Sequence, residues 1–508
     1  MGRRTLGSVE PFLVALPAAR RALAILFVMT AALPAAAQAP ADCPGPGVDD
    51  RCELWVAIED DPDGAAPAQN PTDLAVSPDG SVVYLATQDV AGTGFDSLSR
   101  WAISARNAAT GVVLWSSREG APTQYAFPTG IEVSPDGSRV FVTGTRRANY
   151  NDPDGHLTTR ALNATNGELL WTATYDGPGN GTDNARDLVV SPDGSEVYIA
   201  GISGTGSNLD FVGLAYDAET GEELWATRYN GPGNNTDSPF DIALSDDGAT
   251  LVLAGWSDGA GEFNIDFGTV AFDTRGPNRG GIRWVGRYDR GPGVTPERAN
   301  AVAISPDGSL VFVGGMSGTF ETGDYRFTTV AYDAATGAQR WEAFRNWEGT
   351  DFDEITAMAV APDGSAVYVT GQSTANRQSD IATVAYAPTT GQELWNMREA
   401  APEHQTELGK DIVATTNGVY VTGLSIQTLA VQPLFAIADI ADQVTVAYAP
   451  ATGAELWVAR LNASTLGVTT GQELEIGGGR LFVAAHSAEN FSADSDYRDA
   501  VVAAYTLP

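Results

Sequence analysis

Short apolar runs separated by tight turns make up a unit that recurs along most of this 508-residue chain. In one copy, residues 187–190 form a mostly apolar run without alternation, a pattern typical of a strand buried on both faces. The following Ser-Pro-Asp-Gly at 191–194 predicts a tight turn, because proline presets its φ and glycine closes it. Three more strands are predicted over 196–201, 210–216 and 223–227. Four antiparallel strands of this kind are typical of one β-propeller blade.

The unit repeats about every 57 residues, and each copy carries a turn and, about 30 residues later, a tryptophan. The turns stand at Ser77–Gly80, Ser134–Gly137, Ser191–Gly194, Ser245–Gly248, Ser305–Gly308, Ala361–Gly364, Thr415–Gly418 and Gly477–Gly479. The tryptophans are Trp55, Trp115, Trp171, Trp225, Trp284, Trp341, Trp395 and Trp457. Eight turns and eight tryptophans predict an all-β fold, an eight-bladed β-propeller of four-stranded antiparallel blades.

The two ends of the repeat array predict how the ring of blades closes. The last unit supplies strands over 473–476, 480–484 and 500–505, but it has no fourth strand and no tryptophan. The segment 53–58, which contains Trp55, is a strand without a blade. We therefore predict that the N-terminal strand closes the last blade, which removes two exposed strand edges. Seven blades with one repeat set aside is the alternative.

The two faces of the ring are predicted to differ. The turns between strands one and two, and between strands three and four, are short and alike in most copies. The loops between strands two and three, and between blades, vary most, at 146–154, 257–264, 319–324, 425–439 and 487–497. Function on rigid scaffolds collects on such loops, so we expect the binding face there.

A longer motif, Ala-x-Asp-x-x-Thr-Gly-x-x-x-Trp, is complete at 215–225 and 331–341 and partial in most other copies. It resembles the tryptophan-docking motif of the quinoprotein (pyrroloquinoline quinone, PQQ) dehydrogenase-like eight-bladed propellers. With the Gly-Pro-Gly-Asn loop at 231–234, it is also similar to the repeats of uncharacterised secreted bacterial propellers. The resemblance covers about residues 53–508 and implies that the repeated indoles are structural, each packed between adjacent blades with its N–H bound to the backbone.

For the dehydrogenase activity the resemblance is poor. Those enzymes carry an adjacent Cys-Cys pair over the quinone, whereas Cys43 and Cys52 are separated in the sequence and precede the ring. No Cys-x-x-Cys-His haem motif occurs, and no matching motif places the family's calcium-binding Glu-Asn-Asp set or its catalytic Asp. Other members of the superfamily are non-catalytic scaffolds, among them an outer-membrane assembly lipoprotein.

The sequence therefore predicts an exported, non-catalytic β-propeller scaffold that binds a protein, a glycan or a small ligand through its variable loop face. No cofactor is expected, and PQQ enters only under the alternative, a PQQ-dependent oxidoreductase. A purely structural surface protein is a third interpretation. The sequence contains no phosphate-binding loop and no dinucleotide-binding fingerprint.

Residues 1–37 have the pattern of a signal peptide. Arg20 and Arg21 precede the apolar run 22–33, which is followed by a proline and small residues. That run is too short to span a bilayer, so we expect no membrane insertion. The predicted location is secreted or periplasmic.

Residues 38–52 form a predicted N-terminal segment ahead of the propeller, which spans 53–508. In an oxidising compartment, Cys43 and Cys52 form one disulfide that pins this segment. Two free thiols are the alternative.

Charge narrows the choice of partners. The formal net charge of −35 argues against nucleic acid and anionic membranes, which both need basic surface. The surface is acidic with a single lysine, Lys410, which suits high external salt. A GC-rich genome would give the same bias. We expect a monomer whose partner is an unknown protein or glycan.

Acidic residues recur where the chain enters the innermost strand of a blade. They are Asp73, Asp187, Asp241, Asp411 and Glu473. Such a ring of carboxylates would suit a cation, but each can instead accept backbone N–H bonds at its own blade junction. We favour the second interpretation, because the feature repeats whereas a site is usually unique.

A second acidic column opens the third strand, and its predicted role is loop capping. Its members are Asp210, Asp266, Asp380, Asp442 and Asp499, with Arg100, His156 and Arg326 where the pattern breaks. Calcium is left open at the cluster Asp494, Asp496 and Asp499 and at the pair Asp61 and Asp63, although neither has the spacing of a full calcium loop.

Candidate ligand contacts are residues that break the repeat on the loop face. They are Trp256, His486, Trp347, Arg146, Arg147 and Tyr150. The only histidines, His156, His404 and His486, fall in three different blades, which argues against a three-histidine metal site.

Overall fold

The computed structural model describes the propeller repeats with gaps at several loops. The described residues are 53–59, 68–91, 98–118, 124–149, 152, 154–178, 181–206, 208–259, 265–290, 297–319, 324–347, 352–375, 378–399, 406–431, 436–461, 468–488 and 498–507. The chain divides into two compact units, 1–42 and 43–508, and all described residues belong to the second. The predicted signal peptide, Cys43 and Cys52 lie outside the described residues.

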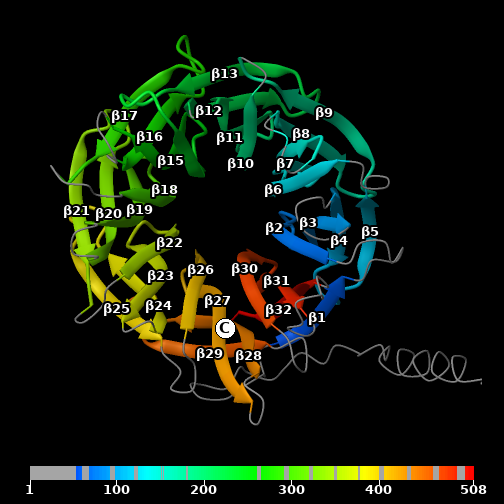
Figure 1. Ribbon diagram of the computed structural model, residues 1–508, viewed down its shortest axis with the longest axis vertical. Helices are drawn as coiled ribbons and strands as arrows, with labels where there is room; N and C mark the ends of the chain where they lie inside the picture. The colour runs from blue at the N-terminus through cyan, green and yellow to red at the C-terminus, as the bar shows by residue number, and fades with distance from the viewer. Residues whose placement is uncertain are drawn as a thin grey trace, which may run out of the picture. The chain divides into compact units, whose positions relative to one another are not determined.

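The second unit is an all-β ring of eight four-stranded antiparallel blades, as the repeat predicted (Figure 1). Blades 1 to 4 are β2 (Ala68–Val76), β3 (Val82–Ala91), β4 (Leu98–Asn107), β5 (Val113–Arg118); β6 (Tyr125–Val133), β7 (Arg139–Arg147), β8 (His156–Asn163), β9 (Leu169–Tyr175); β10 (Thr182–Val190), β11 (Glu196–Thr205), β12 (Asn208–Asp217), β13 (Glu223–Tyr229); and β14 (Asp237–Leu244), β15 (Thr250–Asp258), β16 (Ile265–Asp273), β17 (Ile282–Tyr288). Blades 5 to 8 are β18 (Arg298–Ile304), β19 (Leu310–Thr319), β20 (Asp324–Asp333), β21 (Gln339–Arg345); β22 (Phe352–Val360), β23 (Val367–Ala375), β24 (Gln378–Tyr386), β25 (Glu393–Glu399); β26 (Thr406–Ala414), β27 (Val419–Val431), β28 (Ala436–Tyr448), β29 (Glu455–Leu461); and β30 (Val468–Gly477), β31 (Arg480–Ala488), β32 (Arg498–Thr506), with β1 (Glu53–Glu59) as the fourth strand.

The N-terminal strand closes the last blade, which confirms the prediction made from the two ends of the array. β1 pairs antiparallel with β32, with Trp55 opposite Ala504 and Ile58 opposite Val501. Two segments from opposite ends of the sequence therefore share one sheet, and the first and last blades meet without a free edge.

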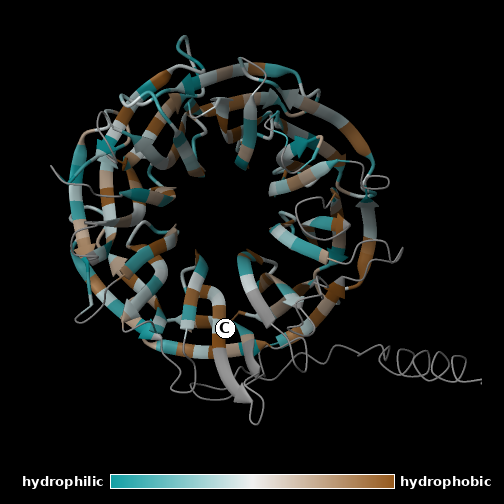
Figure 2. Ribbon diagram, viewed as in Figure 1, coloured by the Kyte–Doolittle hydropathy of each residue, from teal (hydrophilic) through white to brown (hydrophobic). Residues whose placement is uncertain are grey.

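Burial falls from the middle of each blade to its outer edge. In blade 3, seven consecutive residues of β12 are buried, whereas no residue of the outer strand β13 is. Along the outer strands, hydrophobic and hydrophilic residues follow one another closely (Figure 2). Burial on both faces therefore marks the middle strands. The run 187–190 was predicted to be such a strand, but it lies in the innermost strand β10, where buried and half-buried residues alternate because one face lines the channel.

Tryptophans join neighbouring blades at the outer edge. The indole N–H of Trp171, in blade 2, donates to the carbonyl oxygen of Ala218, in blade 3, at 3.1 Å. Trp55 makes the same bond to Ala108, also at 3.1 Å, and so seals blade 8 to blade 1. In both cases the acceptor is the residue that follows the motif's Asp or Asn, so these two tryptophans contact the motif of the next blade. The indole N–H groups of Trp225 and Trp457 have no hydrogen-bond partner among the described residues.

The motif glycine is needed at the same junction. Gly221 has φ of 73° and lies under the Trp171 ring, so that a Cβ there would come within 2.7 Å of the indole. Glycine alone combines this backbone conformation with so close an approach. The motif thus unites a left-handed turn with a docking surface for the preceding blade.

One loop prediction is wrong. Residues 425–439 were expected to form a variable loop, but most of them extend β27 and β28 into a long hairpin, with Leu429 opposite Ala438. The segment has unbroken antiparallel pairing from Val419 to Val431, so its backbone hydrogen bonds are satisfied as a ladder.

Candidate binding site in the central channel

A β-bulge in every innermost strand places two successive residues on the channel wall. In β10 the pairing with β11 slips between Ala185 and Asp187, which leaves Arg186 as the extra residue. Arg186 and Asp187 are both half-buried and both line the channel, although neighbours in a regular strand would face opposite ways. The same slip occurs in each of the other seven blades.

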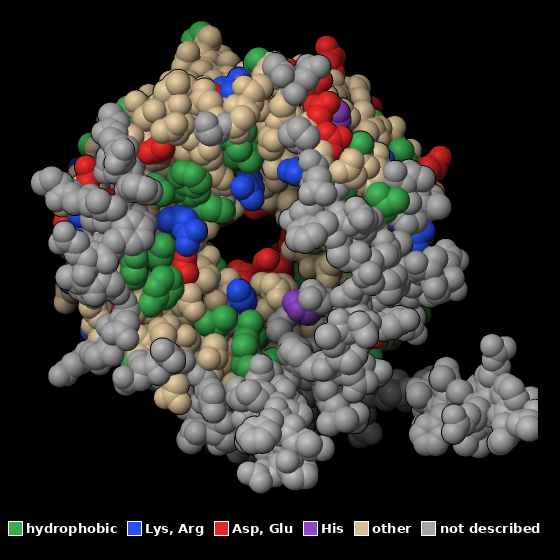
Figure 3. Space-filling view, in the orientation of Figure 1, with side chains coloured by type: hydrophobic (Ala, Val, Ile, Leu, Met, Phe, Trp, Pro, Cys, Tyr) green, Lys and Arg blue, Asp and Glu red, His purple; other side chains and the backbone are tan. Residues whose placement is uncertain are grey.

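The bulges line a central cavity of about 460 Å³ with charged and polar groups. Five acids reach it, each from a different blade, namely Asp73, Asp187, Asp241, Asp411 and Glu473. The basic residues in its wall are Arg186 and Lys410. Figure 3 shows the opening at the centre of the ring, with acidic side chains on its wall and basic ones around its mouth.

The ring aspartates accept backbone N–H bonds, as the favoured interpretation predicted. Asp73 accepts from Leu74 in its own blade and from Ile131 in the next blade, both at 2.7 Å. Asp241 and Asp411 bridge their blades in the same way. Asp187 accepts from Leu188 at 2.7 Å. The two interpretations are therefore compatible, because the same carboxyls hold the junction and line the channel.

Burial raises the pKa values of these carboxyls. It raises the pKa of Asp73 to about 8, with the charges of Glu475 and Asp411 adding to the effect. Burial likewise raises the pKa of Asp241 to about 7. The pKa of Asp187 lies well above its usual range, from burial and then from the neighbouring Asp73, Asp241 and Asp411.

Two further acids share this environment. Glu132, whose Oε2 accepts the Val190 N–H at 2.7 Å, has its pKa raised to about 8 by burial, and burial does the same for Glu475. Near neutral pH, part of this acidic lining is therefore protonated. A cation in the channel would favour the charged carboxylates and displace those protons.

A second cavity, of about 440 Å³, shares Thr129, Arg186 and Phe240 with the first. Its wall also includes Gln472 and His486, which lie 3.5 Å apart between Nε2 and Nδ1. The Arg186 guanidinium lies 5.5 Å from the centre of the Phe240 ring and donates to Ser238 Oγ at 3.0 Å. A cation, an aromatic ring and an imidazole thus converge beside the acidic channel.

Of the ligand contacts expected from sequence, His486 lies at these cavities. Trp347 packs edge-on against Phe327 at 5.2 Å within a hydrophobic cluster. Trp256, in β15, stands opposite Ser238 and is not part of either cavity wall.

The two arginines expected to bind ligand lie in β7 of blade 2. The Arg146 guanidinium lies over the Trp101 ring at 5.5 Å, and Arg147 donates to Asn184 Oδ1 at 2.8 Å. Tyr150, Asp494, Asp496, Asp61 and Asp63 lie outside the described residues, and Asp499 stands opposite Ser487 in blade 8.

Sequence reasoning missed Arg186 and Phe240. Both immediately precede a ring aspartate, at a position of the innermost strand that varies widely between copies. That position holds Thr72, Thr129, Arg186, Phe240, Asn300, Thr356, Lys410 and Gln472. Comparing this column between copies would have found the channel wall.

Three members of the second acidic column form ion pairs, which corrects the prediction of loop capping at those positions. Asp210 pairs with Arg228 at 2.7 Å and Asp380 with Arg398 at 2.6 Å, and Asp266 pairs with Arg287. Each arginine stands three residues after the repeat tryptophan. The pairs join the third and fourth strands of a blade.

One short motif in blade 4 matches the Gly-x-Ser-x-Gly pattern of a nucleophile elbow in sequence but not in structure. Residues 255–259 read Gly-Trp-Ser-Asp-Gly, but they continue β15 into its exit and do not form a strand-to-helix elbow. Ser257 is buried, and its Oγ donates to Asp237 at 2.5 Å. The Ser257 hydroxyl therefore has a structural role, because it holds Asp237 at the start of β14.

The channel does not fit PQQ. This quinone carries three carboxylates, which the five acids of the wall would repel. Only Arg186 and Lys410, among the residues that line the cavity, would attract them. An acidic lining with raised pKa values suits a cation, which is the opposite requirement.

Comparison with known proteins agrees with the fold. A family model described as outer membrane protein assembly factor BamB matches residues 99–269, 214–442 and 379–505. No curated protein matches the sequence. Within the described residues, no helix is long and apolar enough to cross a membrane.

Solved structures with similar folds belong to unlike proteins. Sqt1 of Chaetomium thermophilum, bound to the N-terminus of ribosomal protein L10, aligns with a TM-score of 0.54 at 12% identity, over 87% of this chain and 100% of that one. The quinohemoprotein alcohol dehydrogenase of Comamonas testosteroni aligns with a TM-score of 0.50 at 13% identity, over 90% of this chain and 77% of that one. At such identities the likeness concerns the fold alone.

Proposed function

The chain belongs to the family described as outer membrane protein assembly factor BamB, a family of PQQ-like β-propellers, and on that premise we propose that it is an exported, non-catalytic binding protein. Its ligand is a small cation that enters the central channel from the loop face. The mouth, with Arg186, Phe240 and His486, selects the ligand, and the acidic wall holds its positive charge.

One observation carries this proposal, the convergence of carboxyls with raised pKa values on one cavity. The five ring acids belong to five different blades, and Arg186 and Lys410 are the basic groups that share the cavity wall. A surplus of buried negative charge is unfavourable unless protons or cations balance it. A bound cation provides that balance at neutral pH.

The remaining wall residues suit an organic cation. Phe240 offers an aromatic face, and Asn300 and Thr356 offer polar groups beside the carboxyls. A cation that also has apolar methylene groups and hydrogen-bond donors, such as a polyamine, would use all three.

Isothermal titration calorimetry with spermidine tests the proposal. At pH 7.5 we expect a saturable site and a binding heat that differs between two buffers of different ionisation enthalpy, because binding releases protons from the wall carboxyls. Asp187→Asn should weaken binding about tenfold or more, while it keeps the Oδ1 that accepts the Leu188 N–H.

Glu219→Gln is the matched control, because Glu219 is exposed in a turn away from the channel. It should leave spermidine binding unchanged. Equal weakening by both variants would reduce the effect to general attraction by an acidic protein and contradict the proposal. So would a quinone absorbance that saturates with added PQQ and calcium, together with dye reduction by alcohols.

A further inference from the structure

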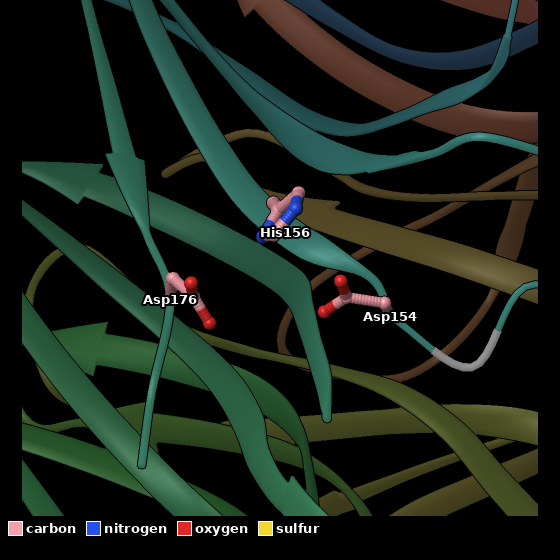
Figure 4. A group of neighbouring side chains, drawn as sticks. All are labelled: Asp154, His156 and Asp176. Carbon is pink, nitrogen blue, oxygen red and sulfur yellow. The ribbon is translucent and has the colours of Figure 1, made fainter. Parts of the chain in front are cut away.

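Asp154, His156 and Asp176 form a compact trio at the end of blade 2. One ligand atom from each lies within 4.8 Å of the others. His156 begins β8, Asp154 lies in the loop before it, and Asp176 directly follows β9. Figure 4 shows both carboxylates turned toward the space beside the imidazole. None of the three lines the channel cavities, so this trio is separate from the proposed ligand site.

The backbone around the trio is held in place by the next blade. The Gly155 N–H donates to the Gly181 carbonyl at 3.2 Å, and the Asp183 N–H donates to the Gly155 carbonyl at 2.8 Å. A Cβ at Gly155 would come within 3.0 Å of both Arg147 and Asn184. The two residues that flank Gly155, Asp154 and His156, are therefore fixed by a tightly packed bridge between blades.

Two polar atoms of the trio have no hydrogen-bond partner among the described residues. His156 Nδ1 and Asp154 Oδ1 are shielded from solvent, and within the described part of the chain neither has a hydrogen-bond partner. Shielded polar atoms without a partner are uncommon in folded proteins and call for a ligand, an ion or water. Both atoms belong to groups that bind metals.

Five other blades carry an arginine on the fourth strand, three residues after the repeat tryptophan, beside the position equivalent to His156. In blade 3 the residue equivalent to His156 is Asp210, which pairs with Arg228 three residues after the tryptophan. Blade 2 has Thr174 in place of that arginine. The cross-strand neighbour of His156 is Arg146, whose guanidinium lies over the Trp101 ring. Blade 2 therefore keeps the acidic surroundings of the ion pair while it lacks the repeat's guanidinium.

A second cluster shows the contrast directly. Asp266, Asp289 and Glu297 also bring their oxygens within 4.8 Å of one another, in blade 4 and the loop that follows it. There Arg287 is present and pairs with Asp266. The Arg287 guanidinium already offsets the charge of Asp266 in that cluster, so an added cation would have to compete with it.

We propose that Asp154, His156 and Asp176 bind a divalent transition-metal ion, with Zn²⁺ as the best match. An imidazole and two carboxylates form a mixed nitrogen and oxygen donor set, which favours Zn²⁺ over Ca²⁺ or Mg²⁺ because those ions prefer oxygen alone. Ligand atoms around a tetrahedral Zn²⁺ lie roughly 3.4 Å apart. Rotation of the two carboxylates closes the difference, and water completes the coordination.

Zinc titration of the purified protein in excess Ca²⁺ tests this site, since Ca²⁺ fills all-oxygen sites elsewhere on the acidic surface. We expect one Zn²⁺ site whose affinity falls at least about tenfold in His156→Gln. The double variant His156→Asp with Thr174→Arg rebuilds the ion pair of blade 3, so it should fold normally and lose the site.

Asp289→Asn is the matched control, because Asp289 occupies in blade 4 the exposed position that Asp176 occupies in blade 2. It should bind Zn²⁺ as the unaltered protein does. The chain has only three histidines, so imidazole ¹⁵N spectra can identify which ring shifts on zinc addition. Unchanged affinity in both His156 variants, or a zinc-induced shift at His404 or His486 instead of His156, would overturn the proposal.

Discussion

The outer seams between blades and the wall of the central channel come from the same repeat but use it in opposite ways. At the outer seams, Trp171 and Trp55 make the same bond to the next blade, and a motif glycine lies beneath each ring. At the channel, the residue before the acid is Arg186 in blade 3, Phe240 in blade 4 and Lys410 in blade 7. Positions that repeat hold the ring together, and positions that vary give the channel its chemistry.

The contrast also separates two kinds of interaction. The seam uses large aromatic surfaces and, at most junctions, an indole hydrogen bond to the next blade, both of which stabilise the fold directly. The channel gathers carboxyls whose charges oppose one another. Stability should therefore depend on the seam tryptophans at any pH, whereas repulsion among the channel acids should weaken the fold only when these acids ionise.

The largest effect should come from pH, because several channel carboxyls act together. Folding raises the pKa of Asp73, Glu132 and Glu475 to about 8 and that of Asp241 to about 7, from ordinary values of 3.8 for Asp and 4.5 for Glu. The folded state therefore holds more protons than the unfolded state between these values. This stabilisation is complete below about pH 4 and is lost as pH rises through 7 to 8.

Thermal unfolding from pH 5 to pH 8.5 checks this slope. The midpoint should fall as pH rises, and it should fall less in Asp187→Asn, which removes one of the interacting charges. Saturating spermidine should also flatten the slope. A midpoint that rises steadily across this range would contradict the raised pKa values.

The next largest effect on stability is expected at the seam tryptophans. Trp171→Ala should lower the free energy of unfolding by about 3–5 kcal/mol, since it removes a large buried ring between two blades. Spermidine binding by the folded fraction should not change. Urea denaturation followed by circular dichroism measures the loss, and a smaller loss than that of Asp187→Asn at pH 5 would reverse the assignment of roles.

Alanine substitutions at two glycines distinguish the cost of backbone conformation from the cost of steric overlap with a seam tryptophan. Gly221 and Gly308 have φ of 73° and 69°, but a Cβ at Gly221 meets the Trp171 ring, whereas a Cβ at Gly308 has open space. Alanine should cost about 1–2 kcal/mol at Gly308 from backbone conformation alone. At Gly221 it should cost at least about 1 kcal/mol more. Equal losses in urea denaturation would show that the ring adapts.

The smallest effect concerns the indole hydrogen bond. Trp171 donates to Ala218, whereas the Trp457 N–H is buried without a partner among the described residues. Trp171→Phe should therefore lose about 1 kcal/mol more than Trp457→Phe, which is the net value of a typical hydrogen bond. Chemical denaturation of both variants under identical conditions measures the difference.

The sequence predicted the parts of the fold that repeat. Blade number, the closing role of the segment with Trp55 and the docking of indoles all follow from periodic positions, and the structure agrees. The bulge at Arg186 was not predictable in the same way, because it depends on how β10 pairs with β11. Hydropathy along one strand contains no signal for an extra residue in the pairing.

The candidate sites show the same limit. Asp210 pairs with Arg228, which lies on the next strand, so its column looked like a set of loop caps when each strand was considered alone. Comparing whole copies would have shown that His156 and Thr174 change together in blade 2. Two residues on neighbouring strands that both differ from the repeat therefore indicate a functional site better than a single unusual residue does.

The shared eighth blade has a consequence for assembly. β1 precedes and β32 follows every other strand, so their pairing joins the two most distant strands of the sequence. Such a contact forms late, because its loop-closure entropy is offset only after the intervening sheets are ordered. The nascent polypeptide must therefore keep β1 unpaired until β32 has been synthesised. An incomplete chain would expose unpaired strand edges, which favour aggregation and which ring closure covers.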